Sequence, residues 1–446
     1  MTPRRHRIKV AVRSRNGQRG VALLAVMTAI AVCLVIASDF GTQSTLDTLA
    51  AANHRDTVRA HFLARSALDL SELIIRLQQR VDNIEQLKGI QITDFADMLM
   101  PAFCGSGDEF RDFLGMDAHD AKGLGVGAGA SCGIKIATSD EEKINVNCAL
   151  ANGDVPKTLK ARIEALYYFG AFDPIFEEED AEGWRRTREV QSASIVDYAD
   201  RDSGKFDSPG TGEDYGYENL RDPYKPKNNY LDTVGEIKLA RGVDDRFWTL
   251  FGDAFTVYGG CKSNVSTLSN VNVIAMIIYL SVKENDPIKG KLDQLWMLAS
   301  VVAKARELGF TFQKLADFAD FVKDPVAAAS SGLGIPGLPG QPPQQPSQQS
   351  NPFANLIPPG MKIGAELDQT KLGQIAKDGA HRVYRIEAWG EAIREAKDSD
   401  GNYLFPPVRR TMTAVWDTSP TPQNERTPAS GSSQHLHGAW VFLREE

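Results

Sequence analysis

The chain has 446 residues, enough for two or three domains, and its hydrophobic content of 42% is ample for a packed core. Its formal net charge is −8, and removing the seven cations of the first 20 residues leaves −15 for residues 21–446. Because binding to the phosphates of nucleic acid requires a basic face, this balance argues against a nucleic-acid partner.

The first 40 residues combine a basic leader with an apolar run. Residues 1–20 carry seven Lys or Arg and no acid, and no charge occurs from Val21 to Ser38. Eighteen helical residues span about 27 Å, close to a hydrocarbon core of about 30 Å. The positive flank predicts a membrane anchor whose N-terminus stays in the cytoplasm. However, Val35-Ile36-Ala37 also suits a signal-peptidase cut before Ser38, so both interpretations stay open at this point.

A long amphipathic helix is expected directly after the apolar run. Between Thr42 and Lys88 there is no Gly or Pro, and apolar residues recur at spacings of three and four. They are Leu63, Ala67, Leu70, Ile74 and Leu77. The apolar segment therefore continues into the domain, with a soft joint at Gly41, and a secretion signal has no need of that continuation. Loss of a partner complex in Leu70→Asp or Ile74→Asp would place this face in a contact between subunits.

A third interpretation places a cut between Gly20 and Val21. A basic leader ending in Gly, an apolar helix and an amphipathic extension are the layout of type IV pilins and pseudopilins. Most pilins have Glu at the fifth position after the cut, where this chain has Ala25. A carboxylate in the bilayer costs several kcal/mol unless it finds a partner. In pilins the usual proposed partner is the N-terminal amine of a neighbouring subunit. A subunit with Ala25 cannot make that contact, which suits the end of a filament.

Four of the five cysteines would lie outside the cytoplasm on this topology, where disulfides can form. They are Cys104, Cys132, Cys148 and Cys261, while Cys33 lies in the apolar run. Four cysteines allow three pairings, and the pairing stays open.

The remaining elements are expected in chain order as follows. The segment 134–146 alternates Ile134 and Ile136 with, after a polar turn, Ile144 and Val146, which predicts a β-hairpin. Residues 236–255 predict two short helices around Gly242. The expected organisation is a leader (1–20), a transmembrane and amphipathic helix (21–100), the start of a sheet (101–150), a first helical insertion with an acidic loop (151–260), a second helical part (261–329), a Pro/Gln/Gly-rich linker (330–360) and C-terminal strands (361–446).

A weak internal repeat accompanies this organisation. "INVNCAL" (144–150) and "SNVSTLS" (263–269) share N-V-[NS]-[CT], and each leads into a helical stretch. Asn, Ser and Thr side chains accept hydrogen bonds from the free N–H groups at a helix start. Each copy is therefore interpreted as a strand that is followed by a helical insertion.

Three motifs occur in the same order in one known family. They are "DEEKINVN" (140–147), the acidic run 197–222 with the following "KNNYLDTVGEI" (227–237), and "NVSTLS" (264–269). With these motifs the chain resembles the type II secretion system protein K family, the large minor pseudopilin, over residues 16 to about 325 and more loosely over the C-terminal strands. That family also lacks Glu at the fifth mature position, so Ala25 supports the resemblance.

The resemblance implies an α+β fold: a pilin-like core of one long N-terminal helix and an antiparallel sheet, with an inserted, mostly helical domain of two SAM-like parts. It implies processing by prepilin peptidase between Gly20 and Val21, with methylation of the new N-terminus. It implies a single pass through the inner membrane with most of the chain in the periplasm. It also implies a place at the tip of the pseudopilus, bound to the minor pseudopilins I and J, other pseudopilins and inner-membrane secretion components.

The acidic run carries eight carboxylates and three cations between Asp197 and Asp222. Clustered carboxylates on an irregular chain repel one another unless water or a hard cation with six to eight oxygen ligands neutralises them. An EF-hand starting at Asp200 fails, because its twelfth residue is Thr211. The resembling family binds calcium in this domain, so calcium is the expected ion, and the expected ligands are Asp200, Asp202, Glu213 and Asp214.

No nucleophile or phosphate-loop pattern stands in its required structural context, so no enzymatic activity is expected.

Two functions remain: a membrane-inserted minor pseudopilin that initiates or caps a filament for protein export, and a secreted or membrane-anchored calcium-stabilised binding protein with no filament role. The first residue of the mature chain separates them. Val21 supports the first function, Ser38 a secreted protein, and an intact Met1 a plain anchor.

Overall fold

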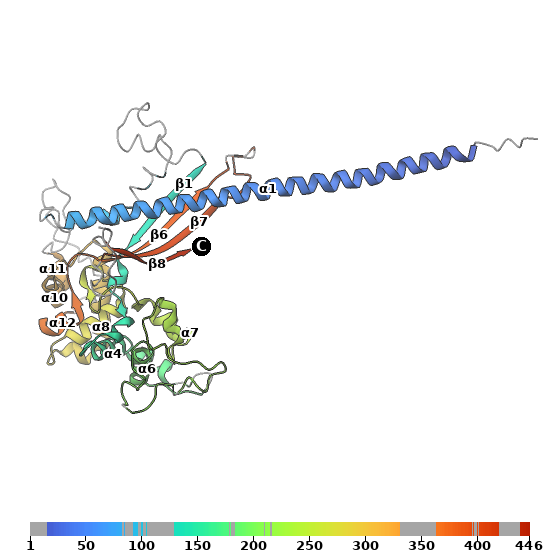
Figure 1. The fold of residues 1–446 in the computed structure, drawn as a ribbon. Helices are drawn as coiled ribbons and strands as arrows, with labels where there is room; N and C mark the ends of the chain where they lie inside the picture. The colour runs from blue at the N-terminus through green and yellow to red at the C-terminus, as the bar shows by residue number, and fades with distance from the viewer. Residues whose placement is uncertain are drawn as a thin grey trace, which may run out of the picture.

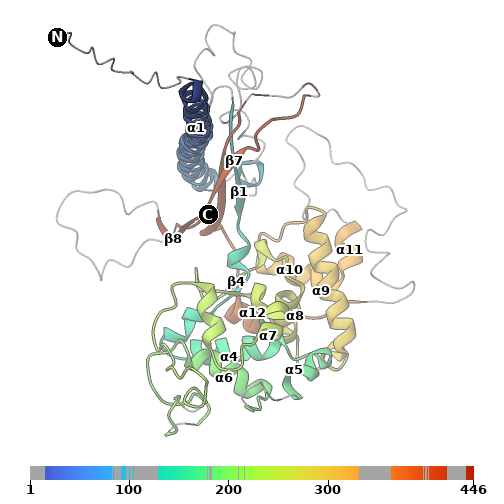
Figure 2. The same ribbon diagram turned by 90° about the vertical axis from the view of Figure 1, so that its right-hand side faces the viewer.

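A computed structural model describes residues 16–82, 84, 92–96, 100, 104, 129–177, 179, 183–208, 210–214, 216–330, 363–394, 396, 399, 401–418 and 438–446. A four-stranded sheet lies against one long helix, and a helical head lies beyond the sheet (Figures 1 and 2). The expected α+β combination of a long N-terminal helix, an antiparallel sheet and further helices is confirmed. Most of the leader and of the Pro/Gln/Gly-rich stretch lies outside the described residues.

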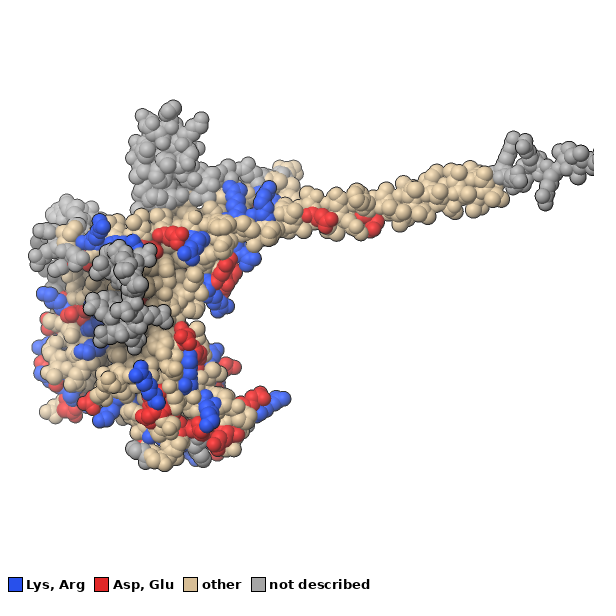
Figure 3. All heavy atoms as spheres, in the orientation of Figure 1, with Lys and Arg blue, Asp and Glu red and all other residues tan. Residues whose placement is uncertain are grey.

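Helix α1 (Asn16–Asp82) is continuous and passes through Gly41 without a break. Its N-terminal half projects from the rest of the molecule and carries few charges (Figures 1 and 3). The apolar residues of this half are exposed, and the mean hydropathy of its most apolar 18-residue window is 2.7. The C-terminal half packs on the sheet, so one helix joins a segment able to span a membrane to the folded core.

The sheet has the order β1 (Ala130–Ala137), β6 (Val383–Ala392), β7 (Val408–Asp417) and β8 (Ala439–Glu445), and all neighbours are antiparallel. Tyr384, Ile386 and Ala388 of β6 are fully buried against α1, while the intervening Arg385 and Glu387 face away. This alternation confirms the strands expected from the period-two pattern. Cys104 and Cys132 form a disulfide that ties residue 104 to β1.

The expected contact face of the long helix needs a correction. Ile74 and Ala67 are buried in the protein's own core, where they pack with the sheet, and Leu77 is exposed. Ile74→Asp would therefore unfold the core rather than test a partner. The helical period predicted that one face is apolar, but it could not predict what covers that face. Large apolar residues left open on the sheet-packed half of α1 include Phe62, Leu73 and Leu77.

The predicted hairpin at 134–146 is also wrong. β1 pairs with β6, whereas β2 (Ile144–Asn145) leaves the sheet and pairs in parallel with β3 (Phe255–Thr256). Asp140, Glu141 and Glu142 occupy the intervening turn and are buried rather than solvated. Asp140 pairs with Arg385 of β6, Glu141 accepts from Asn264, and Glu142 accepts from Ser269. These contacts fix the point at which the chain leaves the sheet and enters the head.

The internal repeat corresponds to two similar structural units. β4 (Ser263–Asn264) pairs in parallel with β5 (Ala376–Lys377), as β2 pairs with β3. Asn145 and Asn264 each accept from the backbone N–H two residues ahead, and each donates its amide to a carbonyl just past the second strand of its pair. A disulfide between Cys148 and Cys261 links the two units. Each unit is therefore a helical insertion closed by a short parallel strand pair.

The helices of the head fill these two insertions (Figure 2). The first holds α4 (Val155–Leu166), α5 (Asp173–Glu177), α6 (Arg188–Asp197) and α7 (Asp245–Phe251). The second holds α8 (Val271–Ser281), α9 (Leu292–Glu307), α10 (Leu315–Lys323), α11 (Pro325–Ser330) and α12 (Gln369–Ile375). Short 3-10 helices are η2 (Ile92–Phe95), η3 (Ser139–Glu141), η4 (Val146–Leu150), η5 (Gly170–Phe172), η6 (Val234–Leu239), η7 (Gly252–Ala254), η8 (Val265–Thr267) and η9 (Pro287–Gly290).

Gly390 sets the distance between α1 and the sheet. A Cβ atom at this position would lie 2.3 Å from the Ala60 carbonyl oxygen and 2.5 Å from the Ala64 backbone nitrogen. We expect Gly390→Val to destabilise the chain by about 3 kcal/mol, because both neighbours are backbone atoms of a helix that cannot move locally. Urea unfolding measures this. Gly373→Ala is the matched control, since a Cβ there meets nothing within 4 Å; an equal loss in both variants would contradict the close-packing argument.

Candidate metal centre

Helix α6 and the loop after it position three carboxylates. Thr187 caps the helix by accepting from the Val190 N–H, and the helix ends at Asp197, three residues before Asp200. The loop then folds back on itself through a bridge between Gly204 and Gly212, which returns the chain to the helix end at Glu213.

One oxygen from each of Asp197, Asp200 and Glu213 lies within 4.8 Å of the others. The three residues are at most 8% exposed. Asp197 accepts from the Phe206 N–H at 3.0 Å, and Glu213 accepts from the Asn228 side-chain amide at 2.9 Å. Within the described part of the chain, Asp200 Oδ1, Glu213 Oε1 and Asn228 Oδ1 are buried without a hydrogen-bond donor.

The environment of the three groups disfavours their charged forms. Burial raises the pKa of Asp197 and of Asp200 to about 7; neighbouring carboxylate charges add to this effect, and for Asp197 the hydrogen bond from the Phe206 N–H opposes it. The same causes raise the pKa of Glu213 to about 8, against a weaker opposing effect of the Asn228 hydrogen bond. Groups that would ionise near pH 4 in water are thus held close to neutral pH.

The donor set fits a hard cation. Buried carboxylate oxygens without donors are costly unless a cation or protons neutralise them, and Ca²⁺ binds to carboxylate and amide oxygens. Asn228 adopts a left-handed conformation, with φ of 47°, that brings its side chain to Glu213. The cluster can therefore hold a metal ion through Asp197, Asp200 and Glu213, with Asn228 bound to Glu213 through its amide nitrogen.

The four ligands expected from sequence separate into two groups. Asp200 and Glu213 meet in the cluster, whereas Asp202 accepts from the Gly204 N–H at 2.8 Å and Asp214 pairs with Lys225 at 2.7 Å. Asp197 was not among the expected ligands. Its place at the end of a helix that leads into the acidic loop could have suggested it as a ligand. Its spacing from Asp200 and Glu213 matches no known metal-binding pattern.

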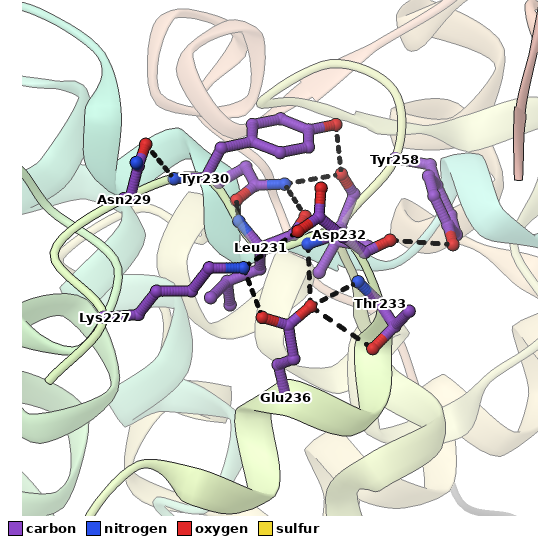
Figure 4. Close-up of polar contacts among 10 residues, drawn as sticks. Lys227, Asn229, Tyr230, Leu231, Asp232, Thr233, Glu236 and Tyr258 are labelled. Carbon is purple, nitrogen blue, oxygen red and sulfur yellow. Dashed lines mark hydrogen bonds and ion pairs between the residues drawn. The ribbon is translucent and has the colours of Figure 1, made fainter. Parts of the chain in front are cut away.

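The stretch 227–236 anchors the exit of the loop (Figure 4). Lys227 bridges Asp232 and Glu236, and Glu236 accepts the N–H groups of Asp232 and Thr233 at 2.8 Å. Leu231 is held by Asn147, which accepts its N–H at 2.7 Å and donates to its carbonyl at 2.9 Å. The "KNNYLDTVGEI" motif is therefore a joint between the acidic loop and the first repeat unit, and it also supplies Asn228.

No family model matches the chain, and no curated protein matches it either. Among solved structures, the chain is similar to one in the GspK-GspI-GspJ complex from the type 2 secretion system of enterotoxigenic Escherichia coli. The similarity covers 90% of this chain and 99% of that chain, with 10% identity and a TM-score of 0.43. A likeness this distant identifies neither the family nor the function of the chain.

Proposed function

We propose that the chain is a minor pseudopilin of a type II secretion system that initiates or caps the pseudopilus at its tip. The observation that carries this proposal is the continuous helix α1, which is apolar and exposed from Val21 and packs on an antiparallel sheet from about Ala60. A cleaved secretion signal does not need a helix that continues into the core. The motifs shared with the protein K family support the same function.

The tip position is proposed from two features. Ala25 stands where most pilins have the membrane Glu, so this subunit cannot make the contact of that Glu with the N-terminal amine of a neighbouring subunit, which suits the end of a filament. The head, in addition, is a bulky insertion beside the sheet (Figure 1). We propose the minor pseudopilins I and J as the partners, with the exposed apolar residues of α1 available for helix contacts in the membrane and above it.

We propose calcium as the ion of the acidic cluster. It would neutralise Asp197, Asp200 and Glu213 and hold the loop to the end of α6. In this proposal a single span anchors the chain in the inner membrane. The head lies in the periplasm, where free calcium is available to the site. The alternative is a calcium-stabilised binding protein, secreted or anchored, with no filament role.

Processing at Gly20–Val21 is the direct test. In a host with prepilin peptidase, the mature chain is expected to begin at Val21 with a methylated amine, and Gly20→Glu is expected to keep the leader. N-terminal sequencing and intact mass measure both. Gly17→Glu, three residues upstream, is the control and should still be cut. A mature chain beginning at Ser38 or at Met1 would contradict the pseudopilin proposal.

A further inference from the structure

A pocket with a volume of about 410 Å³ adjoins the acidic cluster. Asp197 and Glu213 line it, so two of the three groups that could hold an ion border on its interior. One wall is helix α6, on which Val190, Ser194 and Asp197 lie three or four residues apart and therefore share one face. This face leads from the exposed Val190 to the acidic cluster.

The pocket also has an aromatic wall. Trp184 lines it, and the Arg241 guanidinium lies over the Trp184 ring, 4.9 Å from the ring centre. Arg241 does not line this pocket, so the indole presents to it a side other than the one that Arg241 covers. Tyr217 is a second aromatic lining residue, and its position is fixed because its hydroxyl accepts the Arg241 N–H at 2.9 Å. The pocket thus combines a rigid aromatic surface with an end rich in oxygen atoms.

The cluster offers an ion fewer ligands than calcium takes, a step that rests on the calcium centre proposed above. Each of the three carboxylates brings one oxygen within 4.8 Å of the others, whereas Ca²⁺ takes about six to eight oxygens. The Phe206 N–H and the Asn228 amide already bind to oxygens of Asp197 and Glu213. Several positions around the ion are therefore left for oxygens from solution, and the pocket is a side from which they can enter.

These positions favour neutral oxygen donors. Three carboxylates exceed the charge of one Ca²⁺, so a further anion would meet a centre that is already negative. Two neighbouring hydroxyl groups of a sugar are neutral, hard donors that can reach one cation together. The aromatic wall, in turn, offers an apolar surface on which the C–H face of a sugar ring can pack.

We propose that this pocket binds a carbohydrate, with two neighbouring hydroxyl groups on the calcium ion and the sugar ring against Trp184. A volume of 410 Å³ lies in the range of small-molecule sites. The filament role does not require such a ligand. Figures 1 and 2 show α6 at the end of the head away from α1, so contacts that α1 makes in a filament do not involve this end.

Terbium luminescence tests the proposal on the processed full chain in neutral detergent. Tb³⁺ replaces Ca²⁺ at oxygen sites, and its luminescence lifetimes in H₂O and D₂O give the number of bound waters. We expect the bound ion to carry at least about two waters and to lose about two of them to at least one of three probes, the methyl glycosides of mannose, galactose and N-acetylglucosamine. Asp200→Asn/Glu213→Gln should abolish terbium binding.

Val190→Phe narrows the pocket at its rim without touching the proposed metal ligands. We expect it to weaken binding of the displacing glycoside at least about tenfold, or about 1.4 kcal/mol, and to leave the terbium affinity unchanged. Ser194→Phe, one turn nearer the ion, should act in the same way. Val326→Phe is the matched control: Val326 is 39% exposed against 42% for Val190 and also lies near a helix start, but outside this pocket.

The outcomes separate the ligand from the metal. If terbium binds but keeps its waters with all three glycosides, the carbohydrate is wrong and the metal centre is not affected. Displacement by acetate but by no glycoside would also overturn the neutral ligand. If the chain binds neither terbium nor calcium, the metal centre fails and the carbohydrate proposal fails with it. Equal glycoside binding by Val190→Phe, Ser194→Phe and Val326→Phe would overturn the pocket as the binding site.

Discussion

Calcium is expected to raise the midpoint of thermal unfolding of the head by about 5–10 °C at a hundredfold excess over its dissociation constant. An ion that binds the folded state alone contributes about 2.7 kcal/mol under that condition. Asp200→Asn/Glu213→Gln removes two of the clustered carboxylates, and we expect it to abolish the shift. Scanning calorimetry with calcium and with a chelator measures both.

The same groups give the metal-free protein an unusual pH dependence. Asp197 and Asp200, with pKa about 7, and Glu213, with pKa about 8, lose their protons near pH 4 in the unfolded chain. The folded state thus binds more protons between pH 4 and 8, and stability falls as pH rises through that window. Calcium should remove this fall and release protons on binding. The double variant should show a flatter profile and greater metal-free stability at pH 8.

Asp214→Asn is the matched control for the metal centre. Asp214 lies next to Glu213 in sequence but is paired with Lys225, so we expect its removal to leave the calcium shift unchanged. If Asp214→Asn abolished the shift and Asp200→Asn/Glu213→Gln did not, the ligand set proposed from the structure would be wrong. If calcium changed neither stability nor its pH dependence, the metal assignment itself would fail.

The elements that follow from local sequence were predictable. A helix without Gly or Pro from Thr42 onward and the alternation of Tyr384, Ile386 and Ala388 each specify an element through a periodic pattern, and the structure contains both. The repeat around Asn145 and Asn264 was visible because each Asn performs the same local hydrogen bonding. These features depend on neighbours a few residues away.

Features that depend on distant residues were not predictable in the same way. The turn at 140–142 is polar in sequence, and its burial was not predictable because its hydrogen-bond partners lie more than 100 residues away. The acidic loop showed that carboxylates gather, but the fold of the loop decides which of them meet. Asp197 and Asn228 approach Glu213 from a helix end and from a separate irregular stretch, a contact that no spacing encodes.

The buried run Asp140-Glu141-Glu142 joins the sheet to the second repeat unit. Asp140 pairs with Arg385 of β6 at 2.9 Å, and Glu142 accepts from the hydroxyl of Ser269 at 2.7 Å, just before α8. Glu141 accepts from Asn264 at 2.8 Å, from Lys377 at 3.1 Å and from the Arg382 N–H at 3.0 Å. Removing Glu141 would thus take an acceptor from three buried or half-buried donor groups, of which the Asn264 amide keeps the Gly379 carbonyl.

Glu141→Ala is expected to cost about 3–5 kcal/mol of unfolding free energy, the usual loss when one partner of a buried charge network is removed. Burial alone would raise the pKa of Glu141, but His381, Lys377 and Asn264 outweigh it and lower the pKa to about 2. The contribution of Glu141 is therefore complete above its unfolded pKa near 4.5 and is lost as pH falls through about 2.

Urea unfolding between pH 7 and pH 2.5 tests this junction. The unmodified chain should lose more stability on acidification than Glu141→Gln, because the variant has no proton to gain at that position. Glu307→Gln, which breaks an exposed pair with Lys304, should lose less than about 0.5 kcal/mol at every pH. If Glu141→Gln and Glu307→Gln lost the same stability at every pH, the three carboxylates would act as a solvated turn. The connection between sheet and head would then depend on apolar packing and the Cys148–Cys261 disulfide alone.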